Sequence, residues 1–81
     1  MDVEWTETSL DEMADLDKGT ARRVKQSVER FAATGAGNVK RLQGIEPPEY
    51  RLRVGAYRVR FEREEETMRV LRVRHRREAY R

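Results

Sequence analysis

The stretch Tyr50-Arg51-Leu52-Arg53-Val54-Gly55-Ala56-Tyr57-Arg58-Val59-Arg60-Phe61 predicts the central feature of the fold. Apolar and basic residues alternate strictly on both sides of a Gly-Ala pair. This is the pattern of two half-buried strands joined by a tight turn. Gly55 suits the first central position of a type II′ turn, because glycine adopts the required positive φ without strain. The stretch therefore predicts an antiparallel hairpin over residues 50–61.

A two-residue loop at Gly55 and Ala56 fixes the register of this hairpin. The cross-strand pairs on one face are all apolar: Val54–Tyr57, Leu52–Val59 and Tyr50–Phe61. The other face, which we call the arginine face, carries the pairs Arg53–Arg58 and Arg51–Arg60. Like charges directly across a sheet are destabilising, so this face favours an anionic ligand, and phosphate matches the planar fork of arginine. The alternative is a solvated basic face that is loosely paired with nearby glutamates.

The composition indicates one small domain over residues 1–81 with an uneven charge distribution. Residues 1–40 carry six basic and eight acidic side chains, a balance of −2. Residues 41–81 carry twelve basic side chains, all arginine, and seven acidic ones, a balance of +5. A basic half beside a weakly acidic half predicts a one-sided surface that binds a polyanion. No helix with a basic polar face is evident, which favours nucleic acid over a membrane.

The residue types also exclude several classes of protein. The chain has no cysteine, so neither disulfides nor thiolate metal sites are available, as is common in the cytoplasm. With a single histidine we expect no metal site and no small-molecule cofactor. The longest uncharged run, residues 31–39, is far shorter than the ~20 residues that span a membrane. Asp2 and Glu4 stand where a signal peptide would be basic. We therefore expect a cytoplasmic protein without membrane association.

The remaining segments predict an α+β fold. Residues 3–6 read as a strand. A capping box at Ser9 and Glu12 begins a short helix, and Thr20 begins a longer one that ends at Gly35. Residues 35–49 form a Gly- and Pro-rich connector, and Met68–Arg74 forms the last strand. The expected architecture is an N-terminal strand, a two-helix hairpin and a three-stranded antiparallel meander. The helices pack on one face of a four-stranded sheet, and a short C-terminal tail follows.

Arginine, histidine and tyrosine are the residues that could act on a ligand of the arginine face. They suit cleavage of RNA without metal, in which a 2′-hydroxyl attacks the adjacent phosphate, because this reaction needs positive charge around the phosphate and groups that move protons. His75 is of the residue type that titrates near neutral pH, although it also suits packing at a strand end. Strict alternation along the last strand places His75 on the arginine face and Arg76 off it, unless the strand bulges.

Several runs of the sequence resemble the RelE family of toxin–antitoxin modules. They are Leu42-Gln43-Gly44, Tyr50-Arg51-Leu52-Arg53-Val54-Gly55-Ala56-Tyr57-Arg58-Val59, Val73-Arg74-His75-Arg76 and Glu78-Ala79-Tyr80. The resemblance covers nearly the whole chain and includes the order of its elements. It implies a toxin of a type II module that enters the ribosomal A site and cleaves mRNA there. The products would be a 2′,3′-cyclic phosphate and a 5′-hydroxyl, formed without metal.

The same resemblance implies roles for particular residues. Arg58 would stabilise the scissile phosphate, Arg76 would stabilise the transition state or assist the leaving group, and Tyr80 would stack on a base or deprotonate the 2′-hydroxyl. The residues expected to bind the RNA backbone and its phosphates are Arg51, Arg53, Arg60 and His75. Arg74 departs from the pattern, because many relatives have glycine before the His-Arg pair.

The resemblance also implies partners and leaves alternatives open. The expected partners are the ribosome with its mRNA and an acidic RelB-like antitoxin that neutralises the arginine face. A ParE-like toxin, which inhibits DNA gyrase by binding, shares the fold. Such relatives generally lack the terminal pair of arginine and tyrosine that Arg76 and Tyr80 supply here, which favours the ribonuclease. A third possibility is a non-catalytic module that binds RNA or a protein partner through the same fold.

Overall fold

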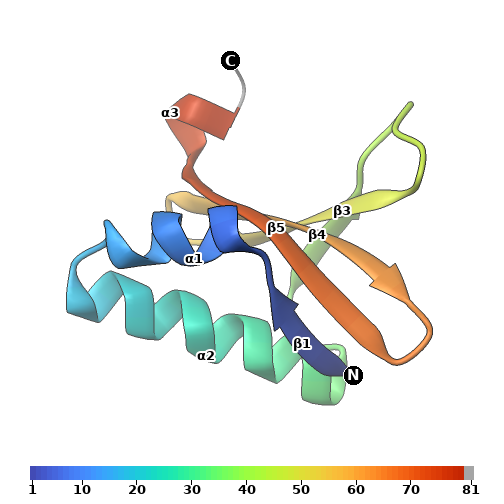
Figure 1. Ribbon diagram of the computed structural model, residues 1–81, viewed down its shortest axis with the longest axis horizontal. Coiled ribbons are helices and arrows are strands. Elements are labelled where there is room, and N and C mark those ends of the chain that lie inside the picture. Colours follow the sequence, from blue (N-terminus) through green and yellow to red (C-terminus); the bar gives the residue numbers. More distant parts are fainter. Residues whose placement is uncertain (80–81) are drawn as a thin grey trace.

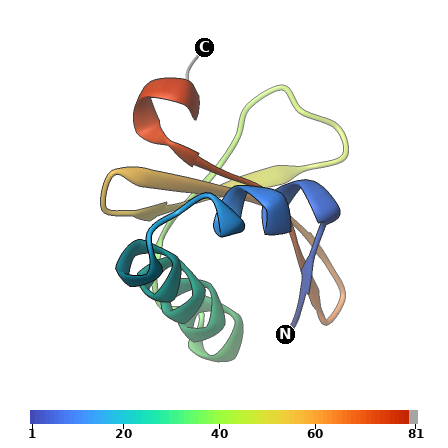
Figure 2. The same cartoon turned by 60° about the vertical axis from the view of Figure 1, so that its left-hand side comes forward.

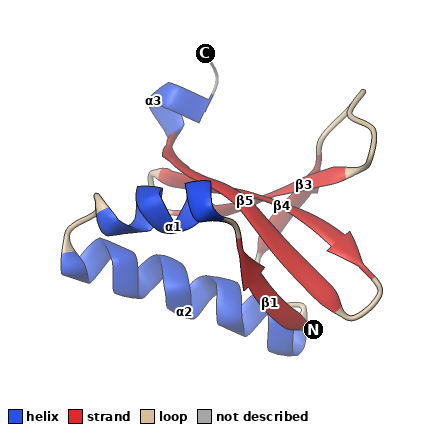
Figure 3. Ribbon diagram, in the orientation of Figure 1, coloured by secondary structure: helices blue, strands red, loops and turns tan. Residues whose placement is uncertain are grey.

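The computed structural model describes residues 1–79 and contains all the predicted elements in the predicted order, with one strand added after the second helix and a short helix added near the C-terminus (Figure 1, Figure 3). The strands are β1 (Asp2–Trp5), β2 (Asn38–Arg41), β3 (Glu49–Val54), β4 (Tyr57–Glu64) and β5 (Thr67–His75). The helices are α1 (Glu7–Ala14), α2 (Lys18–Thr34) and α3 (Arg76–Ala79). The α+β class is therefore confirmed, and the first turn of the expected tail is the short helix α3.

The strands form one five-stranded sheet in the order β1-β5-β4-β3-β2, one strand more than the sequence predicts. β1 runs parallel to β5, and the other neighbours are antiparallel. The additional strand is β2, which lies within the expected connector and pairs with β3 from Asn38 opposite Arg53 to Arg41 opposite Tyr50. It was missed because its four residues include a single apolar one, Val39, too few to show alternation. The pairing covers the edge of β3, whose backbone groups would otherwise be exposed.

The sheet separates two sides of the molecule. α2 lies below the sheet in Figure 1 and α1 lies against β5, whereas α3 and the loop of residues 42–48 rise above the sheet. Figure 2 shows the same division after rotation, with α3 and the loop again on the side away from α2. The side of the sheet away from α2 therefore lies between two projections.

Both α1 and α2 begin earlier than predicted, because different side chains cap them. α1 begins after Thr6, whose hydroxyl accepts a hydrogen bond from the backbone N–H of Ser9 at 3.2 Å. α2 begins after Asp17, whose carboxylate accepts from the backbone N–H of Thr20 at 3.1 Å. Hydrogen bonds from the hydroxyl and then the N–H of Thr20 hold the pKa of Asp17 below its ordinary value of 3.8. α2 ends as predicted at Gly35, which adopts a φ of 76°.

The core lies between α2 and the middle strands. Phe61 of β4 is fully buried, and its ring centroid lies 5.4 Å from that of Phe31 in α2 and 5.5 Å from that of Tyr50. The predicted hairpin register is confirmed, with Tyr50 opposite Phe61 and the turn at Gly55, whose φ is 57°. The remaining fully buried apolar side chains are Val24, Val28, Leu52, Val59, Met68 and Val70. The apolar face of the hairpin thus forms the centre of the fold.

A β-bulge interrupts the pairing of β4 with β5. Arg60 lies opposite Arg72, but the next residue, Phe61, lies opposite Val70, so Leu71 has no partner on β4. An additional residue on one strand reverses the alternation of faces beyond it. The adjacent apolar residues Val70 and Leu71 lie at this bulge, and only Val70 has a partner on β4.

The bulge decides which side chains of β5 reach the arginine face. Val73 is buried on the side of α2, and His75 pairs with Tyr57 on that same side. The bulge is thus the exception under which strict alternation does not hold, and His75 does not lie on the arginine face. Arg74 lies opposite Arg58 instead and joins the arginine face.

Glu12 of α1 covers the part of β5 that extends beyond β1. Its carboxylate accepts from the backbone N–H of Val73 at 2.8 Å and from the Nη2 and Nε of Arg72 at 3.0 and 3.2 Å. The hydrogen bonds that Arg72 donates to Glu12 raise the pKa of Arg72 above its ordinary value. The hydroxyl of Thr6 donates to the carbonyl of Leu71 on the same edge at 3.2 Å. Side chains of Thr6 and Glu12, at the start of α1 and within it, therefore form hydrogen bonds with the β5 backbone that a neighbouring strand would otherwise form.

Replacing Glu12 with alanine is expected to lower the free energy of unfolding by about 1–3 kcal/mol, because the N–H of Val73 and the guanidinium of Arg72 lose a shared acceptor. Glu12→Gln keeps an oxygen for the N–H and should lose less. Urea unfolding followed by circular dichroism measures both. The matched control is Asp11→Ala, which removes an exposed acidic side chain from the same helix. Equal stability of the Glu12→Ala and Asp11→Ala variants would contradict the assigned role.

Candidate nucleic-acid interface

Basic residues from four strands form two rows across the arginine face. The turn row, next to the β3–β4 turn, consists of Arg53, Arg58 and Arg74. The middle row consists of Lys40, Arg51, Arg60 and Arg72. Strands in a sheet lie about 4.8 Å apart, so neighbours within a row are close enough to repel one another. The structure thus brings together the four predicted arginines and adds Lys40, Arg72 and Arg74.

Carboxylates pair with two residues of the middle row, Arg60 and Arg72. Nη2 of Arg60 lies 2.7 Å from a carboxylate oxygen of Glu49, and Arg72 forms its salt bridge with Glu12. Within residues 1–79, no carboxylate lies within 4.0 Å of a guanidinium nitrogen of the turn row. The turn row is therefore the row in which none of the arginines forms a salt bridge with a described carboxylate.

Arg58 is the most enclosed of these arginines. Only 7% of the residue is exposed, and its Nη1 donates to the backbone carbonyls of Gly55 and Tyr57, each at 2.9 Å. Carbonyl oxygens satisfy hydrogen bonds but do not cancel a full charge, and an uncompensated buried charge is costly. An anion bound over the turn row would supply the missing charge. Arg58 therefore indicates a binding site more strongly than an exposed arginine would.

Arg76 lies at the same end of the sheet as the turn row. Its backbone N–H donates to the carbonyl of Ala56 at 2.7 Å, which fixes the start of α3 at the β3–β4 turn, and its side chain is exposed. Tyr80, the other terminal residue with a predicted catalytic role, lies outside the described residues. The predicted roles of Arg58, Arg76 and Tyr80 remain predictions, as do those of Arg51, Arg53 and Arg60.

His75 occupies a separate environment on the side of α2. Its ring meets that of Tyr57 edge-on, with the centroids 5.5 Å apart, and its Nδ1 accepts from the backbone N–H of Arg77 at 3.2 Å. The two rings line a hollow of about 270 Å³ together with Asp15 and Leu16, which follow α1. His75 is thus placed for packing at the strand end, which the sequence left open as an alternative to RNA binding.

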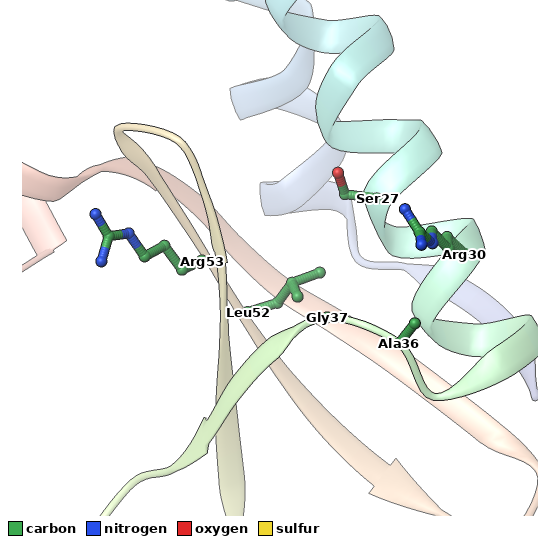
Figure 4. A pocket seen from close by; sticks show the side chains of 6 residues that line it. All are labelled: Ser27, Arg30, Ala36, Gly37, Leu52 and Arg53. Atoms are coloured by element: carbon green, nitrogen blue, oxygen red, sulfur yellow. The ribbon is translucent and has the colours of Figure 1, made fainter.

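Two further hollows flank β3. One, of about 260 Å³, lies between the end of α2 and β3 and is shown in Figure 4. There Leu52 points toward α2, whereas Arg53 points away from Ser27 and Arg30 toward the arginine face. The other, of about 230 Å³, opens on the arginine face itself and is lined by Leu42, Gln43, Ile45, Arg51, Arg60 and Ala79. Both arginines of this second hollow, Arg51 and Arg60, belong to the middle row. In the first hollow only Arg53 belongs to a basic row, because Arg30 lies on α2.

The described residues form neither a cluster of metal ligands nor a membrane-spanning helix. Over residues 1–79, histidine, aspartate and glutamate side chains do not gather in threes as metal ligands do. None of the helices described is both long and apolar enough to span a bilayer.

Comparison with known proteins identifies a family and a fold. Residues 3–80 match the family model described as the ParE toxin of the type II toxin–antitoxin system, parDE. No curated protein shows significant sequence similarity to the chain.

Among solved structures, the RelB–RelE antitoxin–toxin complex from Methanococcus jannaschii has a TM-score of 0.78 at 23% identity, with 95% of this chain and 94% of that chain covered. The archaeal RelE–RelB complex from Pyrococcus horikoshii OT3 has a TM-score of 0.77 at 21% identity, with 93% of each chain covered. The intact Escherichia coli RelBE complex has a TM-score of 0.66 at 18% identity, with 89% of this chain and 92% of that chain covered. At these identities the likeness shows the fold alone.

Proposed function

This chain belongs to the family of ParE toxins of type II toxin–antitoxin systems, and we propose that it is a toxin that cleaves mRNA in the ribosomal A site without metal. The observation that carries the proposal is the turn row, in which the buried Arg58 lies between Arg53 and Arg74 without a carboxylate among residues 1–79. A phosphodiester is the anion that single-stranded RNA offers to such a row.

The proposed reaction is transfer of the phosphate within the RNA chain. The 2′-oxygen forms a bond to phosphorus, the bond from phosphorus to the 5′-oxygen breaks, and the products are a 2′,3′-cyclic phosphate and a 5′-hydroxyl. One proton leaves the 2′-hydroxyl and one reaches the 5′-oxygen. Arg58 stabilises the charge that develops on the phosphate oxygens. Arg76 assists departure of the 5′-oxygen, as the resemblance to RelE implies. The same resemblance implies that Tyr80 stacks on a base or deprotonates the 2′-hydroxyl.

An acidic antitoxin is the proposed protein partner. The similar solved structures from M. jannaschii and P. horikoshii are complexes of RelE with RelB, and the open arginine face is a surface that an acidic segment complements. Exposed charge pairs between the antitoxin and the arginine face are screened by salt. The affinity for the antitoxin is therefore expected to fall as the salt concentration rises.

Inhibition of DNA gyrase by binding is the second candidate. It is favoured by the position of His75 on the side of α2, because that position takes the single histidine of the sequence, a residue type that often transfers protons in catalysis, away from the arginine face. Binding alone requires no such group. The ribonuclease requires Arg76 and Tyr80 for cleavage of mRNA, whereas a gyrase inhibitor does not. Cleavage by variants of these two residues therefore distinguishes the candidates.

Replacing Arg76 with alanine is expected to lower cleavage of translated mRNA by about 10- to 100-fold, because a charge-assisted hydrogen bond to the leaving oxygen is lost. The measurement maps mRNA 5′ ends in a translating extract with the wild type, Arg76→Ala and Tyr80→Phe. The matched control is Arg30→Ala, which removes an exposed arginine from α2, on the other side of the sheet. Ribosome-dependent cuts inside codons that fade in the first two variants support the proposal. Intact mRNA with unimpaired translation would refute it, and inhibition of gyrase supercoiling would then establish the second candidate.

A further inference from the structure

The hollow on the arginine face lies between the two projections that rise from the sheet. Leu42, Gln43 and Ile45 come from the loop of residues 42–48, and Ala79 comes from α3. Figure 1 and Figure 2 both show this loop and α3 on the side of the sheet away from α2. Arg51 and Arg60 of the middle row complete the lining. The hollow therefore adjoins the turn row, which lies two residues further along each strand, about 6.8 Å away.

The size of the hollow limits what it can hold. Its volume of about 230 Å³ lies below the roughly 300–1,000 Å³ of pockets that enclose a drug-sized ligand. One small planar group can occupy it, whereas a longer stretch of nucleic acid cannot. The hollow can thus hold one part of a nucleotide, either a base or a phosphate.

The lining distinguishes a base from a second phosphate. Leu42, Ile45 and Ala79 give the hollow apolar walls, and Glu49 balances the charge of Arg60 through bonds of 3.1 and 2.7 Å to Nε and Nη2. A phosphate gains little from apolar walls and from an arginine that is already paired. A neutral aromatic base suits this lining better, because its faces pack on the apolar walls and its edge forms hydrogen bonds with polar groups.

We propose that this hollow binds one base of single-stranded RNA beside the phosphate held by the turn row, and that Gln43 reads the edge of that base. The inference rests on the proposed function, and it adds a site that decides which sequences bind. The side-chain amide of Gln43 offers both donors and an acceptor, so it can complement the edge of one base and leave another with unpaired groups.

Several backbone features constrain the loop that carries Gln43. The backbone N–H of Leu42 donates to the carbonyl of Glu49 at 2.9 Å and closes the loop at its base. Gly44 adopts a φ of 71°, a conformation that favours glycine, and Pro47 further restricts the chain. A loop constrained in this way orders fewer degrees of freedom on binding, which favours discrimination between bases.

The test measures binding without cleavage. Fluorescence anisotropy follows titration of the full chain into 5′-labelled 2′-O-methyl tetranucleotides of A, C, G or U, in which the nucleophile is blocked. The wild type is expected to prefer one base. In Gln43→Ala that preference should fall by about 3- to 10-fold, the loss that corresponds to one hydrogen bond. Gln26→Ala, which removes an exposed glutamine from α2, is the matched control and should keep the preference. Ile45→Asp, which places a negative charge in the hollow, should weaken binding of all four probes.

Three results would overturn the inference: equal affinity of the wild type for all four probes, no binding of any probe, or an unchanged preference in Gln43→Ala. They are separate from failure of the proposed function. A protein that prefers one base but cuts no mRNA retains the base site and loses the ribonuclease activity. A protein that cuts mRNA but binds all probes equally retains the activity and loses the base site.

Discussion

Replacing Arg58 with alanine is expected to lower the rate of mRNA cleavage by about 100- to 1,000-fold, the usual cost of removing one preorganised donor from a developing oxyanion. The reason lies in how the side chain is held. Two hydrogen bonds to the carbonyls of Gly55 and Tyr57 fix Nη1, so the guanidinium needs little rearrangement when charge develops on a phosphate. Arg53 is exposed and has more side-chain freedom to lose, so Arg53→Ala should cost less.

The Arg58 measurement needs a control for folding, because the alanine variant also leaves the two carbonyls without their donor. Arg58→Lys keeps the charge but not the planar fork, and we expect it to retain part of the activity. Circular dichroism of both variants establishes that they are folded before single-turnover cleavage is compared. Cleavage by a folded Arg58→Ala variant at the wild-type rate would show that the turn row does not hold the reacting phosphate.

Replacing Phe61 with alanine is expected to lower the free energy of unfolding by about 3–5 kcal/mol. Phe61 is fully buried in the middle strand of the sheet and contacts the rings of both Phe31 and Tyr50. Small domains have a total stability of about 5–15 kcal/mol, so one such cavity removes a large part of it. The variant should therefore be partly unfolded near physiological temperature.

Denaturant unfolding followed by circular dichroism tests the Phe61 prediction. Leu10→Ala serves as the matched control, since Leu10 is the large apolar side chain that remains 53% exposed. It should change stability by less than about 0.5 kcal/mol. Similar midpoints for the two variants would show that the apolar face of the hairpin is not the centre of the core.

The hairpin of residues 50–61 could be predicted in full from the sequence. Its period, its Gly-Ala turn and its register all follow from local rules, and they fix both the core position of Phe61 and the arginine face. The four predicted arginines of this hairpin are therefore brought together as expected. Local alternation was sufficient here because every residue from Tyr50 to Phe61, apart from the turn, obeys it.

The position of the β5 side chains could not be predicted by the same rule. Alternation from Val70 places His75 on the arginine face, but the unpaired Leu71 reverses the faces and brings Arg72 and Arg74 there instead. Side chains from another part of the chain bind β5 at the bulge and just after it: Thr6 donates to the carbonyl of Leu71, and Glu12 accepts from the N–H of Val73. Nothing within β5 itself specifies those contacts.

The sequence by itself therefore determined the fold class, the hairpin and the sign of its open face, because these depend on periodicity and on neighbouring residues. The tertiary structure decided which arginines remain without a carboxylate, how far Arg58 is buried, and that residues 42–45 meet α3 around a hollow. Those properties depend on residues that are distant in the chain, such as Glu49 beside Arg60 and Glu12 beside Arg72. The residue type alone gives the charge of a side chain, but whether an opposite charge pairs with it depends on which residues the fold brings next to it.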